Sequence, residues 1–175
     1  MKTTVVLTFL AAGLSGALAA QRHHGAYIGT GFDAIGGAHG AYGLSFQAGY
    51  VRQVNRFGIR LGATYVERDG EYSPGSFERL RLVGANAELS YDLATGRFRP
   101  YVLGGLGLYR ISTTHISPAS AFPVDGVSPA VIGGLGFRYR IGKIDVFAEG
   151  RVHGFTSKIN CGCFVTPITF GLRFD

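Results

Sequence analysis

The chain has no tryptophan, a single methionine and only three lysines among its 175 residues, and its positive charge comes mainly from fourteen arginines. The surface of a soluble domain is usually well supplied with lysine and glutamate, so this scarcity argues against an ordinary soluble protein. Beyond the N-terminal twenty residues, no stretch shows helical periodicity or a helix-start signal. These absences exclude a helical domain and leave the β classes.

Motifs for catalysis or metal binding are also missing. Four of the histidines are scattered without metal-ligand spacing: His23, His24, His39 and His115. His153 and Ser157 share a face of an extended chain, but four residues along a strand span about 13 Å, too far for a direct hydrogen bond. The sequence therefore predicts no catalytic residue, no metal site and no cofactor.

The N-terminus has the pattern of a secretory signal peptide. Lys2 precedes an apolar run from Val5 to Leu14, and Ala17 and Ala19 satisfy the small-x-small rule for cleavage after Ala19. A membrane anchor is the weaker interpretation because the run is too short to span a bilayer. No cysteine stands at the cleavage site, so a lipid-modified N-terminus is not indicated. We expect a signal peptide at residues 1–19 and one domain at residues 20–175.

The last stretch of the chain has a period of two. One face is apolar from end to end and closes on an aromatic ring, whereas the other is small or charged. The first face holds Phe164, Thr166, Ile168, Phe170, Leu172 and Phe174, and the second holds Val165, Pro167, Thr169, Gly171 and Arg173. Such alternation over about ten residues predicts a strand that can cross a bilayer when tilted in a closed barrel.

In this stretch the chain resembles the small outer-membrane β-barrel family, which includes the outer-membrane protein A barrel and the opacity-type adhesins. The family's final strand ends on an aromatic residue, whereas here Asp175 follows Phe174. The resemblance implies an integral barrel of a Gram-negative outer membrane with a porin-like fold. It also implies insertion by the barrel-assembly machinery and a structural or adhesin-like role through the extracellular loops.

Eight segments have strand character, with brief and long connections in alternation. The strands are expected at residues 26–32, 43–52, 57–67, 79–91, 100–112, 129–141, 143–154 and 164–174. The brief connections are Asn55-Arg56, Ala94 to Arg97 and Gly142-Lys143, and the long ones include Asp69 to Glu78 and Thr113 to Gly126. This alternation is typical of an up-and-down barrel whose two rims face different compartments. Pro167 lies inside the last strand, where it predicts a bulge or a broken ladder bond.

The two faces of the strands differ in polarity. Apolar residues such as Phe46, Leu61, Leu89 and Leu135 share one face, and we assign that face to lipid. Only residues 100–112 are ambiguous, because Tyr101, Leu103 and Tyr109 on one face compete with Val102, Leu106 and Leu108 on the other. By their height along the strands, seven aromatic residues are expected to form two girdles: Tyr50, Tyr65, Tyr91, Tyr101, Tyr109, Tyr139 and Phe174.

A soluble barrel of the lipocalin sort has the same alternation with its faces reversed, so periodicity alone does not separate the two. Glycine-rich polar faces, scarce lysine and the aromatic girdles favour the membrane barrel. The predicted fold is therefore all-β: an eight-stranded antiparallel up-and-down transmembrane barrel.

Eight strands enclose an interior just wide enough for side chains, which disfavours a substrate cleft and a conducting pore. Paired carboxylates in such a lumen are better explained by an ion network than by acid–base catalysis. The expected members are Arg60, Glu88, Arg138, Arg140, Asp145, Glu149, Arg151 and Arg173.

Two further sites are indicated at the long-loop end. Cys161 and Cys163 flank a glycine and are candidates for a local disulfide, with an intermolecular bond, free thiols or a metal contact as alternatives. Arg79 and Arg81 have the parity of the lipid face and suit phosphate contact, so lipopolysaccharide is the expected ligand. The alternative is that this strand begins later and both arginines are solvated loop residues.

The functional expectation is a non-enzymatic surface protein whose partners are outer-membrane lipid and lipopolysaccharide. The formal net charge of +6 could suggest nucleic acid, but export argues against such a partner. The alternatives are a lipid A acylhydrolase or acyltransferase embedded in a barrel, and a soluble binding barrel.

Overall fold

The computed structural model describes residues 22–33, 42–73, 76–117, 120–156 and 164–175, and their regular structure consists of strands. The elements are β1 (Arg22–Asp33), β2 (Tyr42–Val54), β3 (Phe57–Ser73), β4 (Ser76–Asp92), β5 (Phe98–Ser117), β6 (Ser120–Ile141), β7 (Ile144–Phe155), β8 (Phe164–Val165) and β9 (Pro167–Phe174). The described residues contain no helix long and apolar enough to cross a membrane.

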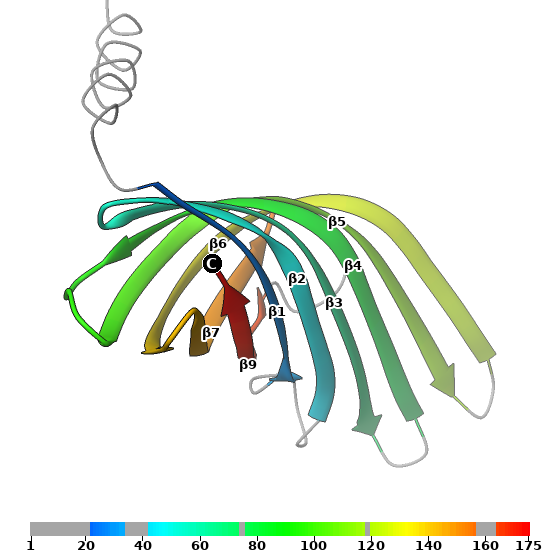
Figure 1. Ribbon diagram of the computed structural model, residues 1–175. Coiled ribbons are helices and arrows are strands. Elements are labelled where there is room, and N and C mark those ends of the chain that lie inside the picture. The colour runs from blue at the N-terminus through cyan, green and yellow to red at the C-terminus, as the bar shows by residue number, and fades with distance from the viewer. Residues whose placement is uncertain (1–21, 34–41, 74–75, 118–119, 157–163) are drawn as a thin grey trace, which may run out of the picture.

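The strands form one closed antiparallel sheet (Figure 1). Each strand from β1 to β7 pairs with its sequence neighbour, and β9 pairs with both β1 and β7 to close the ring. The short β8 continues the β9 register along β7, so β8 and β9 together are the eighth strand. The predicted eight-stranded up-and-down barrel is confirmed.

The predicted break at Pro167 is also confirmed. Thr166 separates β8 from β9 without a change of register. Its backbone N–H donates to Oδ1 of Asp33 at 2.8 Å, and Arg68 donates to Oδ2 of the same carboxylate at 3.1 Å. Asp33 is fully buried, so its side chain satisfies the backbone group that the interrupted ladder leaves unpaired.

The three brief connections lie where the sequence predicts them. Asn55 and Gly142 open two-residue turns with φ of 56° and 65°, and Gly96 has φ of 112° in the connection between β4 and β5. Positive φ is the conformation that tight hairpins require and that glycine and asparagine tolerate. This end of the barrel is called the short-turn end below.

At the opposite end, two of the expected long connections are strands instead. The β3–β4 hairpin continues to Ser73 and Ser76, and the β5–β6 hairpin continues to Ser117 and Ser120. The ladder persists there although the alternating apolar signal stops, because pairing needs only backbone groups. Figure 1 shows these hairpins extending past the shorter strands β1, β7 and β9.

The extension leaves part of β6 paired on one side. The β6–β7 ladder begins at Ala130, opposite Phe155, so the described residues before Ala130 pair only with β5. Pro129, expected at a strand start, therefore lies inside β6 at the point where β7 ends. Its carbonyl accepts a hydrogen bond from the backbone N–H of Thr156 at 3.2 Å.

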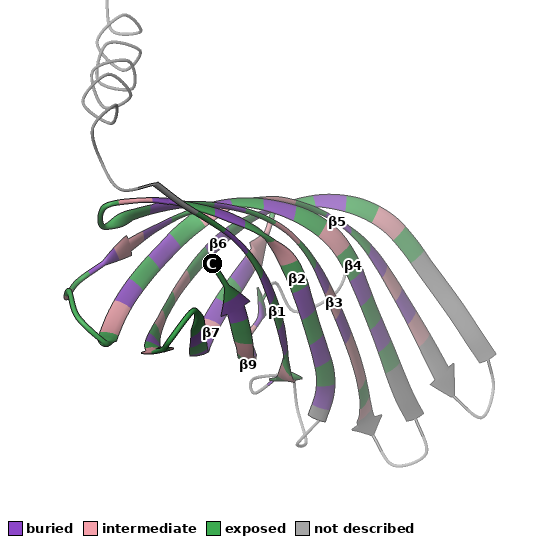
Figure 2. Cartoon of the chain, in the orientation of Figure 1, coloured by how far each residue is buried: buried purple, intermediate pink, exposed green. Residues whose placement is uncertain are grey.

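Exposed and buried residues alternate along the strands (Figure 2). The exposed set is apolar and includes Phe46, Leu61, Leu89, Leu106 and Leu135, whereas buried positions on the other face carry many of the charged side chains. A soluble barrel has the reverse distribution. The structure therefore has the surface of a transmembrane barrel.

The ambiguous strand is resolved, and it corrects part of the aromatic prediction. Val102, Leu106 and Leu108 point outward, so Tyr101 and Tyr109 point into the lumen and do not belong to a girdle. The Tyr101 hydroxyl donates to Glu149 at 2.6 Å, an interior partner that lipid does not offer. On the outer surface the structure places the remaining five: Tyr50, Tyr139 and Phe174 are exposed, and Tyr65 and Tyr91 are partly covered by neighbouring rings.

Candidate functional site

The lumen toward the long hairpins is filled by an apolar layer. Large aliphatic side chains from β3 to β6 meet there, among them Leu80, Leu82 and Ile132, and all are buried. Tyr109 lies within this layer with its ring edge-to-face against Phe155. This layer occupies the lumen toward the long hairpins.

A central network of charged and polar side chains lies on the short-turn side of the apolar layer. Glu149 is at its centre. Its Oε2 accepts hydrogen bonds from Nη1 of Arg60 at 2.8 Å and from the hydroxyl of Tyr101 at 2.6 Å. Its Oε1 accepts from Nε2 of Gln47 at 2.7 Å and lies 2.6 Å from Nη2 of Arg151. Both carboxylate oxygens are thus saturated by donors from four different strands.

Glu88 completes the central network. Its Oε1 lies 2.9 Å from Nη1 of Arg151 and accepts from Nδ2 of Asn86 at 2.6 Å, while Nε of Arg60 lies 3.6 Å from its other oxygen. Two arginines and two glutamates therefore balance in charge. The Arg60 guanidinium also lies over the ring of Tyr27 at 4.4 Å, a cation–π contact.

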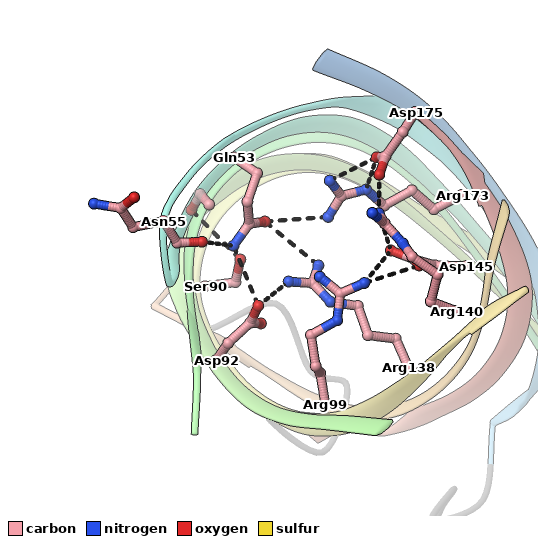
Figure 3. A network of polar contacts seen from close by, with 11 residues as sticks. Gln53, Asn55, Ser90, Asp92, Arg99, Arg138, Arg140, Asp145, Arg173 and Asp175 are labelled. Carbon is pink, nitrogen blue, oxygen red and sulfur yellow. Dashed lines mark hydrogen bonds and ion pairs between the residues drawn. The ribbon is translucent and has the colours of Figure 1, made fainter. Parts of the chain in front are cut away.

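A second group, the short-turn network, fills the other end of the lumen (Figure 3). Arg138 pairs with Asp92, while Arg99 and Arg140 both reach Asp145, at 3.0 and 2.8 Å. Arg173 pairs with Asp175 at 2.8 Å, and Arg140 also contacts Asp175. These side chains come from β4, β5, β6, β7 and the residues at the end of β9, so the network connects these strands across the lumen.

All eight predicted lumen residues lie inside the barrel, but in two networks rather than one. Arg60, Glu88, Glu149 and Arg151 belong to the central network, and the other four belong to the short-turn network. Sequence reasoning missed several interior partners, among them Asp33, Gln53, Arg68, Asp92, Arg99 and Asp175. Asp92 has the parity of Glu88, so extending the alternation to the end of that strand would have found it, whereas Arg99 shares its parity with Tyr101 on the strand whose faces the sequence left ambiguous.

His153, considered from the sequence as a partner for Ser157, lies inside the lumen. His153 is fully buried, and its ring lies edge-to-face with Tyr109 at 5.3 Å between centroids, inside the lumen. Ser157, Cys161 and Cys163 lie outside the described residues. In the part of the chain that the structure describes, no three histidine, cysteine or acidic side chains cluster as metal ligands.

Charged residues gather on the outward face just beyond the apolar band, which ends near Tyr65, Val83 and Leu108. This charged outer rim consists of Glu67, Asp69, Arg79, Arg81, Arg110 and Asp125. Every acid there is paired with an arginine.

The pairs of the rim run across neighbouring strands. Arg79 donates two hydrogen bonds to Asp69, at 2.7 and 3.0 Å, and Arg81 donates to Glu67 at 3.2 Å. Arg110 donates hydrogen bonds from Nε and Nη2 to the carboxylate of Asp125, so this pair is also bidentate. Hydrogen bonds from Arg79 and Arg110 hold the pKa of Asp69 and of Asp125 below the usual range, so both acids stay charged in mildly acidic solution.

The alternative of a later start for this strand is excluded. Because β4 begins at Ser76, Arg79 and Arg81 are strand residues, and both are exposed on the outward face. Their guanidiniums lie on the outside of the barrel, beyond the lipid-facing band. Asp69 and Glu67 of β3 accept hydrogen bonds from some of the N–H groups of each arginine.

Comparison with solved structures identifies relatives of the fold. Neisserial surface protein A superposes with a TM-score of 0.58 at 18% identity, covering 88% of this chain and 98% of its own. The N-terminal β-barrel domain of OprF from Pseudomonas aeruginosa gives 0.56 at 17%, covering 88% and 98%. Ail, the attachment invasion locus protein of Yersinia pestis, gives 0.54 at 15%, covering 86% and 97%.

These likenesses establish the fold. The chain has the architecture of the small outer-membrane barrels, as the sequence predicts. No protein-family model and no curated protein sequence matches the chain.

Proposed function

We propose that this chain is an integral β-barrel protein of a bacterial outer membrane, with a non-enzymatic structural or adhesin-like role at the cell surface. One observation carries the proposal: an apolar outer band, a charged lumen and, beyond the band, long hairpins with a charged outward face. The band suits lipid, and the hairpins offer a surface to partners outside it.

Other roles are less well supported by the lumen. The apolar layer around Leu82 and Ile132 and the two ion networks occupy the barrel interior, where a conducting pore requires water. An acyl-transferring enzyme needs its histidine at the lipid surface, whereas His153 is enclosed.

Lipopolysaccharide is the partner that the charged outer rim fits best. Forked guanidinium groups suit phosphate, and an arginine near the membrane interface costs little compared with one at the midplane. Ail has also been solved in complex with the heparin analogue sucrose octasulfate, which is a polyanion. We extend this chemistry to Arg79 and Arg81. Nucleic acid is not a partner in this proposal, and insertion is assigned to the barrel-assembly machinery.

Membrane location is tested by fractionation. The protein should sediment with the outer membrane and should migrate faster on a denaturing gel when unboiled, because a closed barrel resists detergent at room temperature. A product recovered in the periplasmic fraction, with the same mobility before and after boiling, contradicts the proposed location.

The rim is tested with the double variant Arg79→Ala/Arg81→Ala. Added lipopolysaccharide should raise the melting temperature of the refolded parent, and this rise should shrink with salt because the contact is electrostatic. The variant should lose most of the rise. The measurement is thermal unfolding by circular dichroism with and without lipopolysaccharide at two salt concentrations.

Two further variants sharpen the result. Glu67→Gln/Asp69→Asn frees both guanidiniums from their carboxylates and should enlarge the shift. Arg52→Ala/Arg56→Ala removes two exposed arginines at the short-turn end and should leave the shift unchanged. A shift of equal size in all four proteins would reduce Arg79 and Arg81 to partners of Asp69 and Glu67 alone.

A further inference from the structure

The short-turn network has more positive than negative side chains. Four guanidiniums, from Arg99, Arg138, Arg140 and Arg173, face three side-chain carboxylates, from Asp92, Asp145 and Asp175. The central network above it is balanced, so it contributes no spare negative charge. Each of these guanidiniums has a carboxylate partner, but two of the carboxylates, Asp145 and Asp175, are shared between arginines, so the buried N–H donors outnumber the nearby charged acceptors.

Gln53 lies between two of these guanidiniums. Its Oε1 accepts a hydrogen bond from Arg173 at 3.1 Å and another from Arg138 at 3.4 Å (Figure 3). Two cations therefore converge on one neutral carbonyl oxygen. Arg138 is 6% exposed, and its Nε has no hydrogen-bond partner within the described part of the chain. A buried, charged donor without an acceptor points to a ligand that accepts.

A small cavity lies beside these groups. Its volume is about 20 Å³. Arg138 and Arg173 line it on the side of the short-turn end, and Arg60 lines it on the side of the central network. The hydroxyl-bearing Ser90 and Tyr27 complete its polar lining. Asp145 also lines it, but that carboxylate is held by Arg99 and Arg140. A space of about 10–15 Å³ admits one water-sized sphere, and chloride is only slightly larger.

We propose that this cavity binds one small monovalent inorganic anion, with chloride as the natural occupant, between Arg138 and Arg173. The anion would accept from the Nε of Arg138, which has no partner among the described residues, and would lie beside the two guanidiniums that Gln53 bridges. Bulky organic anions are excluded by the size of the space. This inference is independent of any role of the charged outer rim.

The parent protein gives the first test. Refolded barrel is melted in sodium chloride and in sodium gluconate at equal ionic strength, with circular dichroism as the readout. Binding to the folded state alone should raise the melting temperature in chloride by about 2–4 °C, saturating with concentration. Bromide and nitrate should act as chloride does. Identical curves in chloride and gluconate across the titration overturn the proposal.

Two variants separate a site from a general salt effect. Arg173→Gln removes one cation of the pair and should melt at the same temperature in both salts. Arg68→Gln changes a partly buried arginine at the opposite end of the lumen, where it pairs with Asp33, and should keep the chloride-dependent rise. A rise that persists in Arg173→Gln overturns the proposal.

Anomalous scattering from crystals of the parent grown in bromide gives a readout that does not require a variant to fold. A bromide peak between Arg138 and Arg173 supports the site. Bromide found only on the outer surface of the barrel overturns it.

Discussion

Glu149→Ala is expected to unfold at clearly lower denaturant than the parent. The carboxylate accepts from or pairs with four interior side chains, two of which are arginines at 2.8 and 2.6 Å. Its removal leaves Arg60 and Arg151 sharing Glu88 alone in a buried site. Breaking a buried pair in this way costs about 3–5 kcal/mol. The loss of unfolding free energy is measured by urea unfolding of the refolded barrel. Far-UV circular dichroism is the readout, because the chain has no tryptophan for fluorescence.

The matched controls separate charge from packing. Glu149→Gln keeps the shape and part of the hydrogen bonding, so it should recover some of the stability while remaining below the parent. Asp125→Ala removes an acid that also pairs with an arginine, but on the exposed outer rim, where ion pairs contribute little. Equal midpoints for Glu149→Ala and Asp125→Ala would contradict a stabilising central network.

Leu106→Arg is expected to destabilise the inserted barrel by about 2–4 kcal/mol, the cost of an arginine on the lipid face near the midplane. Leu106 is 66% exposed, and its cross-strand neighbours Ala87 and Val131 are also outward. The measurement is the unfolding free energy in phospholipid vesicles. The same variant in a soluble barrel would place a charge in water at almost no cost.

Leu93→Arg is the control for position. Leu93 is exposed in the connection between β4 and β5 at the short-turn end, where arginine costs only about 0–1 kcal/mol because it reaches the interface. If both variants lose the same unfolding free energy, the cost of arginine does not depend on its position along the barrel axis. That result would contradict the placement of Leu106 near the membrane midplane and of Leu93 at the interface.

Much of the fold is predictable because one face of each strand meets lipid. That contact imposes strict alternation, and residues such as Leu61, Leu89 and Leu135 report it directly. Strand ends beyond the lipid were missed because neither face there must be apolar, so residues such as Asp69 and Arg79 pair across the strands without an alternating apolar signal.

The interior was harder to predict than the surface. Val66 and Leu82 have the same parity as Arg60 and Glu88, yet they form the apolar layer, because depth along the barrel as well as face decides which side chains meet. Tyr101 illustrates the same limit: it is chemically suited to a girdle, but its register opposite Asp92 places it in the lumen. Which carboxylate each of the seven described interior arginines contacts depends on the stagger of the strands around the barrel. The sequence does not give this stagger.

The one-sided segment of β6 affects how copies of the protein behave when crowded. An unpaired strand edge can template another chain, and edge proline is one of the devices that blunts it. The carbonyl of Pro129 points toward β7, so by alternation the backbone groups of Val127, Asp125 and Pro123 point to the same side, where the described residues supply no pairing strand. Two prolines there remove donors from the edge, and this lowers its capacity for edge-to-edge aggregation with neighbouring barrels.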